Sequence, residues 1–165
     1  MGNVVARSEL VKIRQELRQA GKRVVFTNGC FDILHRGHVD YLTKAKALGD
    51  ILIVGLNSDD SVRQLKGPGR PIVGEEDRAI ILAALTAVDF VSIFAEETPY
   101  ELIRAVSPDI LVKGADWPAE EIVGRDVVEA AGGSVHTIDY LPDRSTTGII
   151  QKIAQTVLPH AVTRS

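Results

Sequence analysis

The chain has 165 residues, the length of one ordinary domain, and we expect a single domain over residues 1–165. A hydrophobic content of 45% and a charged content of 25% are typical of globular proteins, and the net charge of -3 excludes a general attraction to nucleic acid or anionic membranes. No apolar run is long enough to span a bilayer, and no signal-like segment opens the sequence. The single cysteine, Cys30, excludes an internal disulfide and is typical of a reducing cytoplasm, where we expect the protein to act.

Helix-like and strand-like segments alternate in the first half of the chain. A helix is predicted over residues 8–20, with Ser8 as its cap and Gly21 as its end, within an N-terminal segment 1–21. The catalytic core is expected over residues 24–158, and it begins with a strand over residues 24–27 whose composition suits burial on both faces. The remaining elements of this half are a helix after Gly37 that ends at Gly49, a strand over residues 51–56 and a short helix capped within residues 57–60.

The same alternation continues in the second half. Helices are predicted over residues 75–87, 98–106 and 120–131 and from Thr146 onward, and strands over residues 90–94, 109–113 and 135–138. The apolar positions that we expect the helices to bury include Ile80, Ile81, Ile149, Ile150, Ile153 and Val157. Together these elements predict an α/β fold with one doubly wound, parallel, five-stranded sheet and helices on both faces.

Two histidines three residues apart, His35 and His38, follow the first predicted strand. Asn28 and Gly29 end that strand, and Gly37 stands between the histidines at the start of a helix. The imidazoles should therefore share space with the free N–H groups and the positive dipole end of the helix. A phosphate placed there would meet oriented donors from both backbone and side chains.

A metal site is the alternative for this segment, because Cys30, Asp32, His35 and His38 are all potential ligands. Four ligands within nine residues match none of the usual zinc spacings, and Cys30 follows a buried strand. The phosphate-binding interpretation is therefore favoured, and Cys30 is interpreted as a small residue in a tight turn.

Several polar loops follow the predicted strands and should meet the histidines at one edge of the sheet. The segment 66–71 contains Lys66 and Arg70 among glycines and prolines, which is typical of a mobile but restricted phosphate-binding loop. The other two loops lie at residues 113–117 and 144–147. In open parallel sheets, ligands bind outside the carboxyl ends of the strands, where the strand order reverses.

These residues resemble a known family. The segment 29–38 resembles the HxGH signature of the cytidylyltransferase-like nucleotidyltransferases, and the segment 144–150 resembles their second signature at the start of the last helix. The segments 27–32, 66–71 and 113–117 resemble the heptose-1-phosphate adenylyltransferase branch. The resemblance covers nearly the whole chain and implies a single Rossmann-like nucleotidyltransferase domain.

The resemblance also implies an activity. AMP would pass from ATP, as its Mg²⁺ complex, to D-glycero-D-manno-heptose 1-phosphate, giving ADP-heptose and pyrophosphate for the lipopolysaccharide inner core. This activity also occurs as one half of a bifunctional kinase–adenylyltransferase, so a separate heptose kinase and phosphatase are expected upstream here. Relatives of this fold commonly pair, which implies a homo-oligomer, most simply a dimer. Two alternatives are a CTP-dependent cytidylyltransferase acting on glycerol phosphate or a similar small phosphate, and a non-catalytic nucleotide-binding regulator.

The resemblance assigns roles to particular residues. The catalytic residues would be His35, His38 and Lys66. The nucleotide and phosphate contacts would come from Asn28, Gly29, Cys30, Phe31, Gly37, Arg144, Ser145, Thr146 and Thr147. The sugar or base contacts would come from Asp32, Asp59, Arg70, Arg78, Lys113, Gly114, Asp116 and Trp117. Mg²⁺ would bridge phosphate oxygens and keep mostly water ligands, with Asp32 as the one candidate protein ligand.

Overall fold

The computed structural model describes residues 1–115, 118 and 121–161, with side chains described as far as residue 157. Six strands form one sheet in the order β1-β4-β3-β2-β5-β6, and every adjacent pair is parallel. The strands are β1 Asn3–Val4, β2 Val24–Gly29, β3 Ile51–Asn57, β4 Phe90–Phe94, β5 Ile110–Gly114 and β6 Ser134–Ile138. The predicted doubly wound parallel sheet is confirmed.

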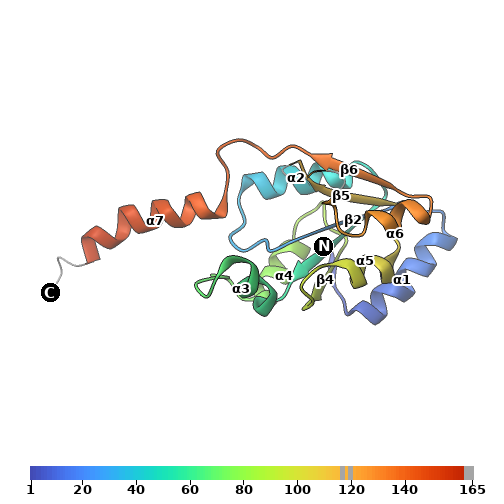
Figure 1. Cartoon of the computed structure of the whole chain (residues 1–165), viewed down its shortest axis with the longest axis horizontal. Helices are drawn as coiled ribbons and strands as arrows, with labels where there is room; N and C mark the ends of the chain where they lie inside the picture. Colours follow the sequence, from blue (N-terminus) through green and yellow to red (C-terminus); the bar gives the residue numbers. More distant parts are fainter. Residues whose placement is uncertain (116–117, 119–120, 162–165) are drawn as a thin grey trace.

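The sheet is covered by helices on both faces (Figure 1). The helices are α1 Arg7–Gln19, α2 Arg36–Lys46, α3 Asp59–Lys66, α4 Glu75–Ala83, α5 Tyr100–Val106, α6 Arg125–Ala130 and α7 Thr146–Ala161. One core cluster packs α2 and α4 against the sheet, and the other packs α1, α5 and α6 against the opposite face. Because both faces are covered, central strands such as β2 and β3 consist almost entirely of buried residues.

The strand order reverses beside β2. The chain passes from β2 to β3 and β4 on one side, and then crosses to β5 and β6 on the other. The carboxyl end of β2 therefore lies at the topological switch point, where parallel sheets of this kind form their ligand sites. The segment with the two histidines begins at this end.

The sheet has one strand more than the five predicted. Asn3 and Val4 form β1, which pairs in parallel with β4 at the edge of the sheet. Two exposed residues carry no hydrophobic alternation, so the sequence pattern gives no sign of this strand. The backbone fixes it, through bonds such as that from Asn3 N–H to the Asp89 carbonyl, at 2.9 Å.

The last helix departs most from the prediction. Figure 1 shows α7 extending away from the sheet and its covering helices. Ile153 and Val157 are 52% and 56% exposed, so the expectation that α7 buries them is wrong. Ile149 and Ile150, near its start, are half-buried. Only the first turn of α7 is thus held close to the rest of the domain.

Smaller differences have local causes. Helix α4 ends at Ala83 and exposes Ile80 and Ile81, because its inward face presents Arg78, Ala79 and Leu82 instead. Helix α1 begins at Arg7 after Ala6, which gives no side-chain cap, so Ser8 is not the cap. Helix α6 begins only at Arg125, because Gly124 before it has a φ of 87° that breaks the helical path.

Candidate active site

The turn after β2 is shaped by one close contact. Phe31 has a φ of 42°, a left-handed conformation uncommon for a bulky residue, and its ring stands against Gly29. A Cβ added to Gly29 would lie 3.0 Å from Phe31 Cε2. Because Gly29 has no side chain, the phenyl ring of Phe31 can pack against the end of β2. The same ring makes an edge contact with His38, with ring centroids 5.2 Å apart.

His35 and His38 stack on each other at the start of α2. Their ring centroids are 3.9 Å apart and the planes differ by 21°. His35 is the N-cap residue of α2, and its Nδ1 accepts a hydrogen bond from the Gly37 N–H at 3.1 Å. Because Nδ1 is an acceptor, the neutral ring carries its hydrogen on Nε2, which remains a donor.

Gly37 is required by this arrangement. A Cβ at this position would lie 2.9 Å from both Cε1 and Nδ1 of His35, and 3.2 Å from Cβ of Arg144. A side chain here would push the His35 ring off its cap position and away from His38. The glycine between the two histidines therefore has a packing reason, in addition to its place at the helix start.

Both imidazoles are neutral at neutral pH. Burial and the neighbouring His35 lower the pKa of His38 from 6.5 to about 4. Burial and the Arg144 guanidinium also lower the pKa of His35. The Nδ1 atom of His38 is buried and has no hydrogen-bond partner among the described residues. The pair can therefore donate hydrogen bonds to an anion but does not supply a positive charge.

The lowered pKa of His38 predicts a pH-dependent stability. Between about pH 4 and pH 6.5 the unfolded chain binds a proton at His38 and the folded chain does not. The free energy of unfolding therefore has its full value above pH 6.5 and falls as the pH drops toward 4. The loss that is due to His38 is about 3 kcal/mol in all. We expect urea unfolding at pH 7 and at pH 4.5 to differ by about 2 kcal/mol more for the wild type than for His38→Gln. An equal difference in the two proteins would contradict the assignment, since all other titrating groups are shared.

The start of α7 is tied to the histidine segment. Thr146 Oγ1 donates to the Ile33 carbonyl at 3.2 Å, which links residues more than a hundred positions apart. Ser145 Oγ accepts from the Gly148 N–H at 3.0 Å and so caps the helix. Thr147 is exposed beside it. The prediction that the second signature lies beside the histidines is consistent with this contact and with the effect of Arg144 on His35.

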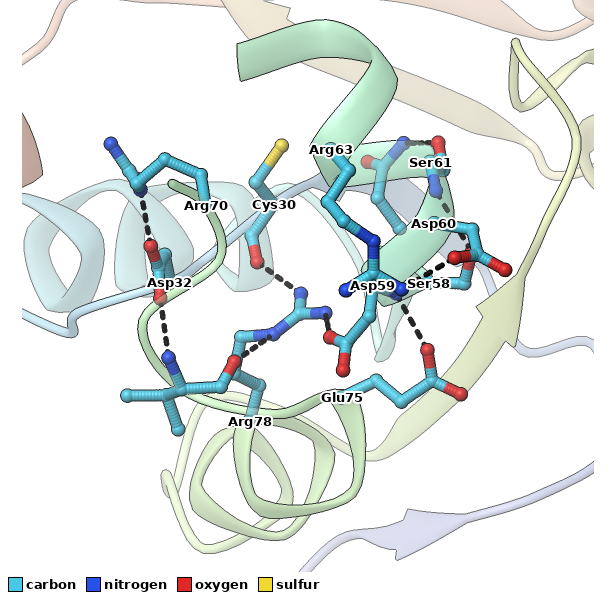
Figure 2. Close-up of polar contacts among 12 residues, drawn as sticks. Cys30, Asp32, Ser58, Asp59, Asp60, Ser61, Arg63, Arg70, Glu75 and Arg78 are labelled. Carbon is cyan, nitrogen blue, oxygen red and sulfur yellow. Dashed lines mark hydrogen bonds and ion pairs between the residues drawn. The ribbon is translucent and has the colours of Figure 1, made fainter. Parts of the chain in front are cut away.

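The buried side chain of Arg78 holds the turn after β2 through hydrogen bonds (Figure 2). The Arg78 side chain is 0% exposed, and its Nη1 donates to the Cys30 carbonyl at 2.5 Å. Its Nε donates to the Val73 carbonyl at 2.9 Å, and its Nη2 pairs with Asp59 at 2.7 Å. Arg78 and Asp59 were predicted as sugar or base contacts. The structure places Arg78 beneath the site, where its bonds to Cys30, Val73 and Asp59 hold the turn in place.

Asp32 anchors the loop that follows Lys66. Its buried carboxylate accepts bonds from the N–H groups of Ile72 and Val73, at 2.8 to 3.0 Å, and from Arg70 Nε at 2.5 Å. Burial alone would raise the pKa of Asp32, but these donors outweigh it and the pKa is lowered. A carboxylate enclosed by donors in this way does not fit a Mg²⁺ ligand. Among the described residues there is also no group of three or more His, Cys, Asp or Glu side chains suited to a metal.

Lys66 is the last residue of α3 and is exposed. Burial raises the pKa of the Cys30 thiol, while Lys66, Arg78 and Arg70 act in the opposite direction. All three cations therefore lie within electrostatic range of the turn that follows β2. Lys66 thus lies near the turn from which the histidine segment starts, and its role as a catalytic residue stays a prediction.

The loop after β5 is only partly described. Lys113 and Gly114 are the last two residues of β5, next to β2 in the sheet, whereas Asp116 and Trp117 lie outside the described residues. In the neighbouring strand β2, Asn28 has a buried side-chain oxygen without a partner among the described residues. The unmet polar atoms of Asn28 and His38 are both at the switch point, as expected for a site that binds a polar ligand.

Two tyrosines at this edge escaped the sequence prediction. Tyr41 on α2 shares a hydrogen bond of 2.8 Å with Thr27 Oγ1, and its ring lies 5.7 Å from that of Tyr140. Tyr140 occupies the space where a Cβ on Gly114 would stand. The position of Tyr41 next to Leu42 and four residues before Ala45 is a helical signal that could have indicated its inward position, whereas nothing near Tyr140 in the sequence indicates its contact with β5.

The fold and the site together define a Rossmann-like nucleotidyltransferase fold with a histidine pair at its switch point. Residues 26–152 match the family described as Cytidylyltransferase-like. The chain belongs to this family, which confirms the predicted resemblance.

Among curated proteins, the chain is 57% identical over 150 residues to "Bifunctional protein HldE" of Wolinella succinogenes, covering 91% of this chain and 31% of that protein. It is 56% identical over 147 residues to the protein of the same name from Syntrophotalea carbinolica, covering 89% and 30%. The chain thus spans about a third of the length of these relatives.

Solved structures resemble this one as well. The lipopolysaccharide core biosynthesis protein from Thermoplasma volcanium is 31% identical with a TM-score of 0.61, covering 73% of this chain and 98% of that one. A pantoate-beta-alanine ligase from Francisella tularensis has a TM-score of 0.64 at 14% identity, covering 98% of this chain and 77% of that one, and shares the fold alone.

Proposed function

We propose that this chain is a heptose-1-phosphate adenylyltransferase that makes ADP-heptose for lipopolysaccharide core synthesis. The observation that carries the proposal is the neutral, stacked histidine pair at the switch point, beside the start of α7. The chain matches about a third of the length of bifunctional HldE proteins. This supports the proposal, because the chain would then carry one of their two functions. The likeness to a lipopolysaccharide core biosynthesis protein supports the pathway.

In the proposed reaction, a phosphate oxygen of heptose 1-phosphate attacks the α-phosphorus of MgATP. The new P–O bond forms as the bond to the β-phosphate bridging oxygen breaks, and pyrophosphate leaves with that electron pair. No covalent intermediate with the protein is required. Catalysis then rests on positioning and on donors that neutralise charge at the α-phosphate.

We assign the donors from their places in the structure. Nε2–H of His35 and the neighbouring His38 donate to the α-phosphate oxygens. Lys66 neutralises the α-phosphate and the incoming sugar phosphate from the end of α3. The β- and γ-phosphates meet Arg144 and the N-terminus of α7, where backbone N–H groups and the helix dipole favour an anion. Asp32 and Arg78 act indirectly, by fixing the loop and the turn that carry these groups.

Pyrophosphate release with each of the four nucleoside triphosphates tests the substrate assignment. We expect turnover with ATP and D-glycero-D-manno-heptose 1-phosphate, and little with GTP, UTP or glycerol 3-phosphate. Turnover with CTP and glycerol phosphate instead would make the chain a cytidylyltransferase. Triphosphate binding without pyrophosphate release for any acceptor would make it a nucleotide-binding regulator.

We also propose that the protein acts in the cytoplasm as a homodimer. None of the helices in the described part of the chain combines the length and apolar character needed to cross a bilayer. Ile149, Ile150, Ile153 and Val157 lie along one side of α7, since they are spaced at about one helical turn, and the last two are exposed. A second copy would cover this apolar side.

Light scattering at micromolar concentration tests the oligomer. We expect twice the chain mass of 17.9 kDa for the wild type and the monomer mass for Ile153→Asp/Val157→Asp. The exposed positions Gln151 and Gln155 on the same helix provide a matched control, and Gln151→Asp/Gln155→Asp should remain dimeric. A monomeric wild type would contradict the proposal.

A further inference from the structure

A cleft lies at the amino ends of the strands, opposite the end that carries the histidines. Its volume is about 550 Å³, within the usual range for small-molecule sites. It opens where β2, β5 and β6 begin, and α1 forms one wall. The residues of interest in its lining are Arg14, Arg18, Lys22, Arg23, Leu48 and Ile110. The candidate active site lies at the carboxyl ends of the same strands, so the two sites are separated by the length of the sheet.

The charge in this cleft is strongly positive. Among the described residues that line it, four are arginines or lysines, whereas Asp109 is the only carboxylate. That carboxylate is already bound, because it accepts from the Val24 N–H at 2.7 Å and from Arg14 Nη2 at 2.9 Å. The whole chain has a net charge of -3, so the excess of cations here is local.

Arg14 forms the buried inner wall of the cleft. The residue is only 4% exposed, and its Nε and Nη2 donate to the Ser107 carbonyl at 3.2 and 3.1 Å. Its Nη1 is shielded from water and has no hydrogen-bond partner among the described residues. A ligand in the cleft would not bond to this nitrogen directly, because no water reaches it, but the buried positive charge of the guanidinium favours an anion nearby.

We propose that this cleft binds a phosphate-bearing small molecule. Guanidinium groups match phosphate oxygens in charge and in geometry, and the exposed side chains of Arg18 and Arg23 are available on the lining. Leu48 and Ile110 offer apolar contact to the rest of the ligand. The site is separate from the proposed adenylyl transfer and stands whether or not that reaction is confirmed.

Residue-resolved amide shifts in the full chain test this site, with inorganic phosphate and AMP as probes. The amides of Arg18, Lys22 and Ser134 report on the cleft, and those of Gly37 and Gly148 report on the active site. We expect saturable shifts at the cleft amides at millimolar phosphate, and tighter binding for AMP, because its nucleoside can contact Leu48 and Ile110.

The variant Arg18→Ala/Arg23→Ala should weaken binding at the cleft amides by roughly tenfold or more and leave the active-site amides unchanged. Both side chains are exposed, so the change spares the core. The control Lys12→Ala/Lys152→Ala removes two exposed charges outside the cleft. It should leave the binding measured at the cleft amides and at the active-site amides unchanged. Absence of shifts at the cleft amides, or equal affinity in both variants, would overturn the proposal. The cations would then only offset the negative C-terminal end of α1.

Discussion

His38→Ala is expected to lower kcat by about a hundredfold or more, or roughly 3 kcal/mol, as losing one donor to a developing charge does. His35→Ala should have an effect of similar size, because its Nε2–H is the donor that the helix cap leaves free. The Michaelis constant for ATP should change much less, since both rings act mainly on the α-phosphate in the transition state. Steady-state pyrophosphate release, combined with nucleotide binding by calorimetry, measures the two quantities.

The neighbouring position Val39 offers a matched control. It lies on α2 directly after His38 and is exposed, so Val39→Ala should keep full turnover. The pH profile adds a second readout: because both histidine pKa values are lowered below 6.5, kcat should not require an imidazolium and should hold from about pH 8 to pH 7. Equal losses of binding and turnover in the histidine variants would show that the pair binds only the ground state.

The placement of this pair was predictable because it depends on local rules. A buried strand, a turn with glycine and a capped helix follow one another within residues 24–46, and each has its own sequence signal. Alternation of strands and helices then fixes a parallel sheet, and a parallel sheet fixes the edge at which ligands bind. The extra strand β1 was missed because backbone pairing alone stabilises it.

The supporting residues were not predictable, because their roles depend on distant partners. Arg78 is a charged residue in a helix, and its sequence neighbours give no sign that Cys30, Val73 and Asp59 will surround it. Its burial turns α4 so that Ile80 and Ile81 face outward. Asp32 similarly becomes a loop anchor only through residues forty positions later.

The course of α7 was also not predictable from the sequence. Its apolar spacing is that of a helix with one buried face, and the sequence therefore predicted burial in the core of the same chain. In the structure that face extends beyond the domain, held at its first turn by Thr146. Periodicity identifies an apolar face but not the surface that covers it.

Lys66→Ala is expected to lower kcat by about tenfold to a hundredfold, while the free energy of unfolding changes by less than about 0.5 kcal/mol. The small stability effect follows from its exposure at the end of α3. Lys66→Arg should restore the rate only in part, because a planar guanidinium does not replace a compact ammonium at a crowded phosphate. Lys12→Ala, at an exposed position on α1, is the matched control and should keep the wild-type rate.

The geometry of the loop explains why Lys66 should act by closure. Gly67 has a φ of 95° and Gly69 has open space around it, so this part of the loop is little restrained, whereas Asp32 holds Arg70, Ile72 and Val73. Hydrogen exchange at residues 66–69 should therefore slow when ATP and heptose 1-phosphate are both added, and the amides of Ile72 and Val73 should be protected throughout. If exchange at residues 66–69 is the same with both ligands and Lys66→Ala keeps full turnover, Lys66 is a surface charge with no part in the reaction.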